Sequence, residues 1–258
     1  MADIHKTAVI DPEARLGEGV QVGPYTVISG DVEIGAGTTI GPHVVIHPHV
    51  RLGRDNAVHA HAVLGDLPQD VAFSGAETRL EIGDRNMIRE NVTVHRASQL
   101  DRVTRIGSDC FLMAGSHVAH DCQVGDRVIL TNNVLLAGVV TVEDGANLGG
   151  AAVIHQFCRI GALAMVGGFG GVGQDVLPYA MVHGIPACHF RLNTIGLRRA
   201  GIKGERYGVL ETAFRALRAG DRELGNPPDT PEVSYLREWL AAPSKRGIAA
   251  WTTPHGGR

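Results

Sequence analysis

Two histidines and a carboxylate lie within five residues of one another in the segment Ser116-His117-Val118-Ala119-His120-Asp121-Cys122. A neutral imidazole can take a proton from a hydroxyl group near neutral pH, because its reference pKa is about 6.5. A carboxylate beside the ring can orient it and stabilise its charged form. The segment is therefore a candidate acid/base centre. The alternative is that both histidines are solvated turn residues, and the cluster alone does not decide between the two.

This cluster lies inside a six-residue repeat. Counting in sixes from Ile4, an aliphatic residue stands at every position as far as Leu64, and the same frame continues to Val172. Only Asp70 and Ala76 break the frame. A period of six is too short for helical repeats. It is the signature of a parallel β-helix, in which short strands wind into coils and each coil buries the apolar face of its neighbours.

The repeat also predicts which side chains point inward. Side chains alternate along a strand, so the residue two places before each aliphatic position faces the core as well. Cys110, Cys122 and Cys158 occupy that position. Because free cysteine behaves as a small hydrophobe, we expect these three in the core rather than in a metal or redox site. Within the cluster, Val118 and Cys122 then point inward, which leaves the two histidines and Asp121 pointing outward.

Two stretches lose the repeat, residues 65–81 and 96–105. Both carry polar and charged residues, so we expect them to leave the β-helix as loops. Loops that project from a rigid scaffold commonly carry binding residues. The two interruptions are therefore candidate walls of a binding site.

The repeat ends after Val172. Apolar residues at helical spacing over 205–219, and a helix start signal at Thr230-Pro231, predict two helices beyond it. The chain is therefore expected to be mainly β. We predict a parallel β-helix over residues 1–185 and a small α-helical C-terminal domain over 186–258.

The hexapeptide-repeat proteins that this pattern resembles have three hexads in each coil, and their coils are left-handed. Residues eighteen apart then stack one coil above another, at about 4.8 Å. Gly138 is expected directly above His120, and His155 two coils above it. His95 and Gly168 are expected one prism face away from His120, so they could meet it only across a contact between subunits. A closed trimer would supply that contact.

The composition argues against several classes of protein. The 24 Lys and Arg against 27 Asp and Glu give a net charge of -3, with no global reason to expect nucleic acid or membrane binding. No apolar run is long enough for a signal peptide or a membrane span, so we expect a cytoplasmic protein. The cysteines lack zinc-finger spacing, and the two histidines of the cluster do not supply a catalytic zinc site, so no metal is expected.

Basic residues gather in the C-terminal part. Such a run is either a solvated face or a dock for an acidic partner. If it is a dock, binding of the acidic partner should weaken as salt is added. The residues are Arg191, Arg198, Arg199, Lys203, Arg206, Arg215, Arg218 and Arg222.

Several segments together resemble the family of acyl-carrier-protein-dependent UDP-N-acetylglucosamine O-acyltransferases of lipid A biosynthesis. The resemblance covers nearly the whole chain. It is more specific than the repeat alone, which many acetyltransferases share. The segments that carry it are Ile82–Glu90, Val92–Arg96, His117–Cys122, Leu136–Gly138, His155–Cys158 and Met165–Gly168.

The resemblance implies transfer of an (R)-3-hydroxyacyl group from acyl carrier protein to the 3-position of UDP-N-acetylglucosamine. His120 would be the general base that deprotonates the sugar hydroxyl, and Asp121 would orient it. The Gly138 amide would stabilise the oxyanion. The enzyme would be a homotrimer with active sites in clefts between subunits, and no metal or cofactor is implied.

The resemblance also implies a set of substrate-binding residues. Gly168 would leave the groove for the acyl chain open, and Asn193 and Arg199 would help bind the uridine diphosphate part. The residues that would hold the sugar nucleotide are Gln69, Asp70, His117, His155 and Gln156.

Some positions depart from the family pattern. Val139 replaces a histidine, Ala72 replaces a lysine in the first loop, and Ala200 stands where an arginine often follows Arg199. These departures leave open a UDP sugar with an amine at C3, which would give an amide product. A related N-acyltransferase and a non-catalytic scaffold also remain open. The N-acyltransferase would have a separate N-terminal uridine-binding domain, whereas the hexads here begin at Ile4.

Overall fold

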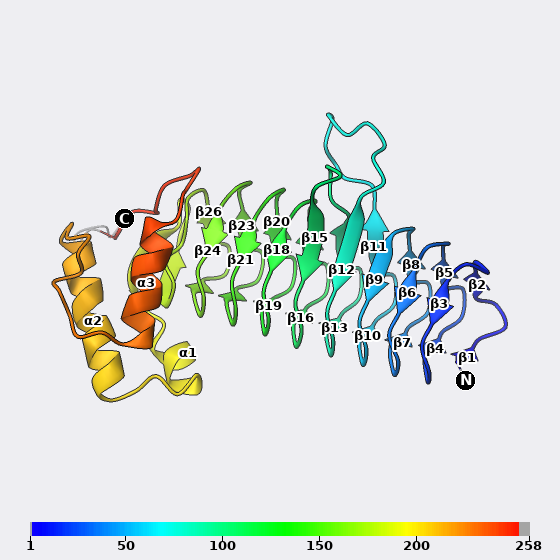
Figure 1. The fold of residues 1–258 in the computed structure, drawn as a ribbon, viewed down its shortest axis with the longest axis horizontal. Helices are drawn as coiled ribbons and strands as arrows, with labels where there is room; N and C mark the ends of the chain where they lie inside the picture. The colour runs from blue at the N-terminus through cyan, green and yellow to red at the C-terminus, as the bar shows by residue number, and fades with distance from the viewer. Residues whose placement is uncertain (1, 253–258) are drawn as a thin grey trace.

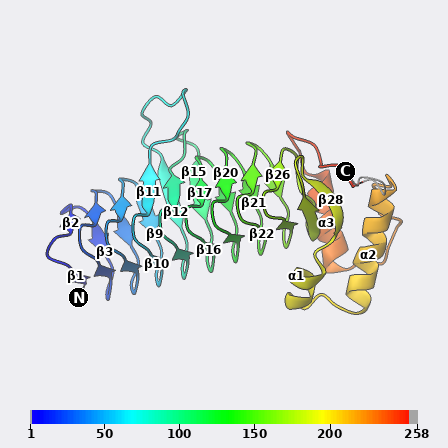
Figure 2. The ribbon, with the colours of Figure 1, turned by 180° about the vertical axis from the view of Figure 1, so that it is seen from behind.

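The computed structural model describes residues 2–252. Its strands form three parallel sheets, which are the faces of a long prism (Figures 1 and 2). Sheet A contains β1 (Asp3–Ile4), β4 (Gln21–Val22), β7 (Thr39–Ile40), β10 (Ala57–Val58), β13 (Met87–Ile88), β16 (Phe111–Leu112), β19 (Ile129–Leu130), β22 (Asn147–Leu148), β25 (Met165–Val166), β27 (Ala180–His183) and β28 (Cys188–Leu192).

The other two faces are built in the same way. Sheet B contains β2 (Val9–Ile10), β5 (Val27–Ile28), β8 (Val45–Ile46), β11 (Val63–Asp66), β14 (Thr93–His95), β17 (His117–Val118), β20 (Leu135–Leu136), β23 (Val153–Ile154) and β26 (Gly171–Val172). Sheet C contains β3 (Arg15–Leu16), β6 (Glu33–Ile34), β9 (Val50–Leu52), β12 (Arg79–Ile82), β15 (Val103–Ile106), β18 (Gln123–Val124), β21 (Thr141–Val142) and β24 (Arg159–Ile160).

The fold is the predicted left-handed parallel β-helix, and the register confirms three hexads in each coil. Gln21 pairs with Thr39, and His117 pairs with Leu135, so most coils hold eighteen residues. The frame residues fill the interior of the prism, where Leu64, for example, is fully buried. The three cysteines in the inward positions are buried as well, which confirms their assignment to the core.

Two coils are longer, because a loop leaves each of them. Residues 67–78 lie outside the strands between β11 and β12, and residues 96–102 lie outside them between β14 and β15. Both loops project from the edge where sheet B passes to sheet C, hereafter the BC edge (Figure 1, top). Leu100 holds a frame position but is 73% exposed in the second loop, so its match to the repeat is a coincidence.

The longer coils correct the predicted position of His95. Thr93 pairs with His117, so the coil that contains the second loop advances by 24 residues instead of eighteen. His95 therefore lies at the end of β14 in sheet B, one coil below the His120 turn, and not one prism face away. The eighteen-residue rule failed here because it was counted across the loop.

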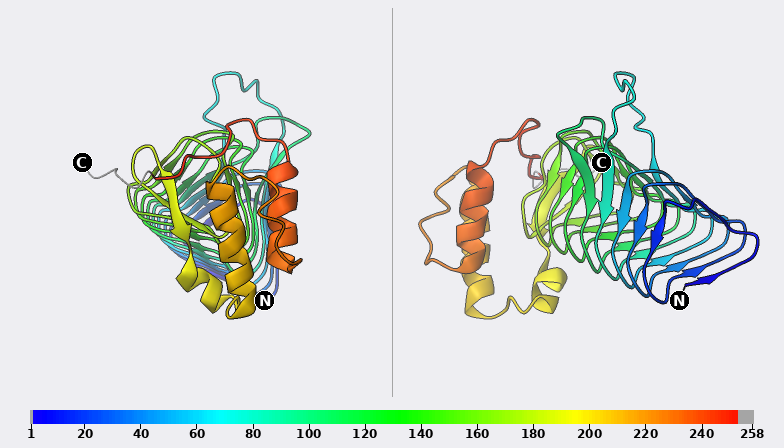
Figure 3. Two further views of the ribbon diagram at one scale, coloured as in Figure 1. Left: turned by 90° about the vertical axis from the view of Figure 1, so that its left-hand side faces the viewer. Right: turned by 45° about the vertical axis from the view of Figure 1, so that its right-hand side comes forward.

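A helical part covers the C-terminal end of the prism (Figure 3). It contains α1 (Thr194–Arg199), α2 (Glu205–Arg218) and α3 (Pro231–Ala241), which pack around Leu210, Phe214 and Trp239. The structure confirms α2 and α3, and the Thr230 side chain accepts a hydrogen bond from the Val233 amide at 3.3 Å as the N-cap of α3. The sequence did not predict α1 or the antiparallel pairing of β27 with β28, and the predicted domain boundary falls in the turn between these two strands.

No helix within residues 2–252 is long and apolar enough to cross a membrane.

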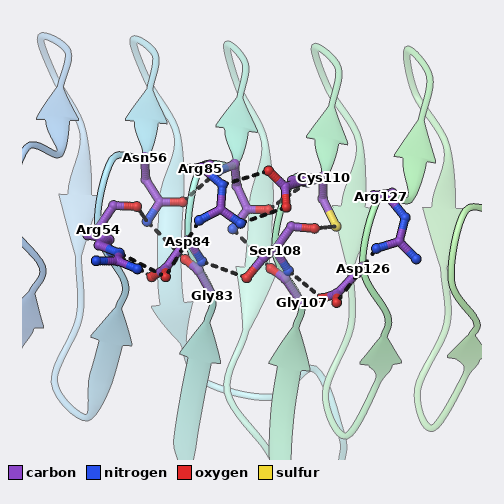
Figure 4. A network of polar contacts seen from close by, with 12 residues as sticks. Arg54, Asn56, Gly83, Asp84, Arg85, Gly107, Ser108, Cys110, Asp126 and Arg127 are labelled. Atoms are coloured by element: carbon purple, nitrogen blue, oxygen red, sulfur yellow. Dashed lines mark hydrogen bonds and ion pairs between the residues drawn. The ribbon is translucent and has the colours of Figure 1, made fainter.

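Polar ladders join successive coils at the edge between sheet C and sheet A (Figure 4). The Asp84 carboxylate accepts a hydrogen bond from the Arg54 amide at 2.9 Å, and Arg85 forms an ion pair with Asp109 at 2.8 Å. Both members of the second pair are about half exposed. Exposed pairs of this kind contribute about 0–1 kcal/mol each, so the Arg85–Asp109 pair adds little to the stability of the fold.

Candidate active site

The predicted acid/base pair lies in the turn that follows β17, on the BC edge. His120 Nδ1 and Asp121 Oδ2 are 2.7 Å apart, and their side chains are only 15% and 2% exposed. Asp121 adopts a left-handed backbone conformation with φ of 61°, which Asp tolerates better than most residues. Its amide donates a hydrogen bond to the Thr104 hydroxyl at 2.8 Å, which fixes the turn.

Hydrogen bonds keep the Asp121 carboxylate ionised. Burial alone raises the pKa of this carboxyl, but the hydrogen bonds from His120 and Ser98 outweigh burial and hold the pKa below its usual value. An ionised carboxylate can only accept hydrogen bonds, so His120 Nδ1 carries the shared proton. The other ring nitrogen, Nε2, then has the free lone pair that a general base requires.

Ser98 contacts the candidate acid/base pair, although the sequence did not single it out. Its amide donates to Asp121 Oδ1 at 3.0 Å, and its hydroxyl donates to Oδ2 at 2.6 Å. Ser98 lies in the loop 96–102, outside the repeat, so no spacing rule connects it with Asp121. The loop thus completes a chain of hydrogen bonds from Ser98 through Asp121 to His120.

Removing the Ser98 hydroxyl is expected to lower kcat/KM about tenfold, because a hydrogen bond to a charged group is lost. In Ser98→Ala the pKa of Asp121 should rise, so the loss of kcat/KM that accompanies protonation of Asp121 in acid should begin at a higher pH than in the native protein. Ser98→Thr keeps the hydroxyl and should restore both the rate and the profile. If the profile of Ser98→Ala matches that of the native protein, Ser98 does not position Asp121.

Gly138 packs directly against the His120 ring, as the stacking of coils predicted. A Cβ atom at Gly138 would lie 2.6 Å from both Cε1 and Nε2 of His120, so any other residue here would push the ring aside. The Gly138 carbonyl accepts a hydrogen bond from the Phe157 amide at 3.2 Å. Within residues 2–252, the Gly138 amide itself donates to no backbone carbonyl, so it is available to a bound group.

A hollow of about 480 Å³ opens beside this pair on the BC edge. It brings together residues from both loops and from three successive turns of the β-helix. The predicted site residues that line it are Gln69, Asp70, His120, Asp121 and Gln156. Lining residues that were not predicted as ligands are Val71, Ser98, Gln99, Arg102, Val139, Phe157 and Lys245. The departure from the family pattern at Val139 is therefore located in the candidate site itself.

The other two predicted histidines do not line the hollow. The His117 ring packs edge-on against His95, with 4.9 Å between the ring centroids, and its Nδ1 lies 2.7 Å from the Thr93 hydroxyl. Burial, reinforced by His95 and His120, lowers the pKa of His117 to about 4, so this ring is neutral near pH 7. His155 is exposed, and its Nδ1 lies 3.1 Å from the carbonyl oxygen of Gln156.

Three more predicted residues lie away from His120 within one chain. Gly168 is in a turn between sheet A and sheet B, against Gly150. Asn193 is buried as the N-cap of α1, accepting from the Gly196 amide at 3.1 Å, and its amide group donates to a backbone carbonyl. Arg199 ends α1, at the opposite side of the molecule from the loop 67–78 (Figure 1). No three His, Cys, Asp or Glu side chains in the described chain are placed to share a metal ion.

The prism of hexapeptide coils, with a His–Asp pair in one of its turns, places this protein among the hexapeptide transferases. The model of the bacterial transferase hexapeptide (six repeats) matches residues 13–48, 31–66 and 104–138. The model described as UDP N-acetylglucosamine O-acyltransferase, domain 2, matches residues 175–249. The chain belongs to the acyl-[acyl-carrier-protein]–UDP-N-acetylglucosamine O-acyltransferase family, as its relatives show.

These relatives are similar over almost their full length. A protein of Alkalilimnicola ehrlichii with that family name is 50% identical over 257 residues, covering 96% of this chain and 99% of the relative. One of Thiobacillus denitrificans is 48% identical with the same coverage. Among solved structures, LpxA from Acinetobacter baumannii superposes with a TM-score of 0.91 at 39% identity, covering 95% of this chain and 99% of the other. The UDP-N-acetylglucosamine acyltransferase of Francisella novicida also gives 0.91, at 30% identity, covering 98% and 95%.

Proposed function

We propose that this protein transfers an (R)-3-hydroxyacyl group from acyl carrier protein to the 3-hydroxyl of UDP-N-acetylglucosamine, the first step of lipid A biosynthesis. The observation that carries the proposal is the His120–Asp121 pair, with Nε2 free beside a hollow, in a chain about half identical to proteins named for this reaction. The reaction needs a base for a hydroxyl and room for a sugar at that base, and the site has both.

The chemistry follows from the geometry. His120 Nε2 takes the proton of the 3-hydroxyl as its oxygen attacks the thioester carbonyl carbon. The carbonyl oxygen becomes an oxyanion, which the free Gly138 amide stabilises. The intermediate collapses with cleavage of the C–S bond. The imidazolium of His120, stabilised by Asp121, returns the proton to the leaving thiolate, so that an ester and the thiol of acyl carrier protein are released.

The remaining predicted ligands are assigned in two groups. Gln69, Asp70 and Gln156 line the hollow, which supports their proposed role in holding the sugar. The other five remain predictions from the family resemblance, and within one chain they do not line this hollow. In the proposed assembly, a neighbouring subunit brings the more distant of them to the site. These five are His117, His155, Gly168, Asn193 and Arg199.

We propose a homotrimer because the three prism faces differ in polarity. The outward residues of sheet C are charged, as at Arg15 and Glu33. Those of sheet B are mostly apolar, and Val9 and Val153 are 62% and 49% exposed. Sheet A is mixed, with polar residues such as Gln21 and Asn147 beside Met87, which is 42% exposed. A cyclic trimer that packs sheet A of one subunit against sheet B of the next covers the apolar face of sheet B and leaves sheet C in water. The BC edge, with its hollow, then borders a neighbouring subunit.

A direct comparison of acceptors tests the proposed reaction. The protein is given a mixture of 3-hydroxyacyl thioesters of acyl carrier protein, together with UDP-N-acetylglucosamine and its 3-amino analogue, and the products are identified by mass spectrometry. We expect the ester product to predominate. A preference for the 3-amino analogue would show that a site with Val139 serves the amine acceptor. If no thioester is consumed, only the hypothesis of a non-catalytic scaffold remains. Weaker donor binding at high salt would support docking of the acidic carrier protein on the C-terminal basic residues.

A further inference from the structure

Two cations at the hollow beside His120 are unused by the proposed mechanism. Arg102, in the loop 96–102, and Lys245, in the segment after α3, both line this hollow. Neither forms an ion pair with a carboxylate in the described part of the chain. The hollow contains two carboxylates: the buried one of Asp121 is bonded to His120 and Ser98, and that of Asp70 accepts a hydrogen bond from the Ala72 amide at 2.9 Å. The two positive charges are therefore available to a ligand.

Lys245 is held in place although it lies close to the end of the chain. The segment that carries it pairs with the end of the β-helix, where the Asp175 amide donates to the Gly247 carbonyl at 2.8 Å and Arg246 Nε donates to a backbone carbonyl at 3.1 Å. Figure 3 shows this red segment returning from α3 to the prism. Lys245 Nζ lies 4.5 Å from the centroid of the Phe157 ring, a cation–π contact that holds the ammonium group at the hollow.

The chemistry of the pair favours a phosphate ligand. A guanidinium group presents a planar fork of N–H donors that matches phosphate oxygens, and an ammonium group adds a compact positive charge. Both substrates of the proposed reaction carry phosphate esters. Resting on that proposed function, we propose that Arg102 and Lys245 form a phosphate-binding pair, which holds a phosphate of one substrate while the reacting atoms lie against His120.

The phosphate has two possible sources. In the sugar nucleotide, the diphosphate is attached to C1, two ring carbons from the reacting 3-position. In the acyl donor, the phosphate is at the far end of the pantetheine arm from the thioester. Both groups present the same tetrahedral oxyanion to the pair, so the experiment must separate them.

Binding of two probes separates the sources. UDP stands for the acceptor and 4′-phosphopantetheine for the donor, and each is titrated by calorimetry into the native protein, Arg102→Gln and Lys245→Met. We expect one probe to bind about tenfold more weakly to each variant, because a hydrogen bond between charged groups is lost. Lys245→Arg should keep most of the affinity, and Lys6→Met, an exposed lysine at the other end of the prism, should keep all of it.

Kinetics give a second readout. The KM of the substrate that carries the phosphate should rise about tenfold, while kcat changes by less than about threefold, because the pair binds a group remote from the reacting atoms. The phosphate pair is rejected if both probes bind both variants within twofold of the native protein, or if neither probe binds the native protein. The binding measurement does not depend on turnover, so the two proposals can fail separately. If the native protein binds a probe through these residues but transfers no acyl group, the proposed reaction is wrong and the phosphate-binding pair is still supported.

Discussion

Replacing His120 with alanine is expected to lower kcat by about three orders of magnitude, because general base catalysis by a positioned side chain contributes about 10²–10⁴-fold. The loss should appear in kcat more than in KM, since the ring acts on the proton in the transition state. Asp121→Asn should also be severe, because an amide can donate to Nδ1 and so favour the tautomer in which Nε2 carries the proton and cannot act as the base. Steady-state kinetics with saturating sugar nucleotide measure both effects.

Two controls make the His120 result specific. The exposed His5→Ala, at the far end of the β-helix, should leave kcat within about twofold of native. Gel filtration of His120→Ala should show an unchanged oligomer, because the ring lies in a surface turn and not in the core. Turnover near the native rate in His120→Ala would remove the central claim about the site.

The scaffold could be predicted from the sequence because it depends on local rules repeated many times. The six-residue frame fixes which side chains are buried, and the alternation of side chains places the cysteines and leaves Asp121 facing outward. The same pattern recurs in every coil, so one chance match, such as the exposed Leu100, does not change the predicted fold. The stacking of residues from one coil to the next is also predictable where the coils have equal length. For this reason Gly138 was placed correctly above His120.

Prediction failed where the chain leaves the repeat. A loop has no fixed length, so the coil with residues 96–102 advanced further than assumed and His95 was misplaced. Ser98 and Lys245 reach the site through a loop and a returning C-terminal segment, whose paths are set by contacts distant in sequence. The repeat thus predicts the turn that carries the base, while loops and termini determine what surrounds it.

The buried pair between Arg159 and Asp175 is expected to stabilise the end of the β-helix against which the helical part packs. Asp175 is fully buried and accepts from the Arg159 amide at 2.9 Å and from its Nε at 2.8 Å. The Arg159 guanidinium lies 4.0 Å from the Trp239 ring of α3. Asp175→Ala should therefore lower the free energy of unfolding by about 3–5 kcal/mol, because it leaves a buried charge without a partner.

The exposed pair between Arg85 and Asp109 is the matched control. Its separation is also 2.8 Å, yet its members are about half exposed, so Asp109→Ala should cost only about 0–1 kcal/mol. The chain has two tryptophans, Trp239 and Trp251, so denaturant unfolding followed by their fluorescence reports on the end of the molecule where Asp175 lies.

A double variant distinguishes the loss of an attraction from the creation of an unpaired charge. If the penalty of Asp175→Ala comes mainly from the stranded Arg159 guanidinium, then Arg159→Met combined with Asp175→Leu should recover much of the lost stability, because neither apolar side chain needs a charged partner. Arg159→Met alone should be nearly as destabilising as Asp175→Ala, since it strands the carboxylate instead. Equal stability of Asp175→Ala and Asp109→Ala would contradict this account, because burial is the property in which the two pairs differ most.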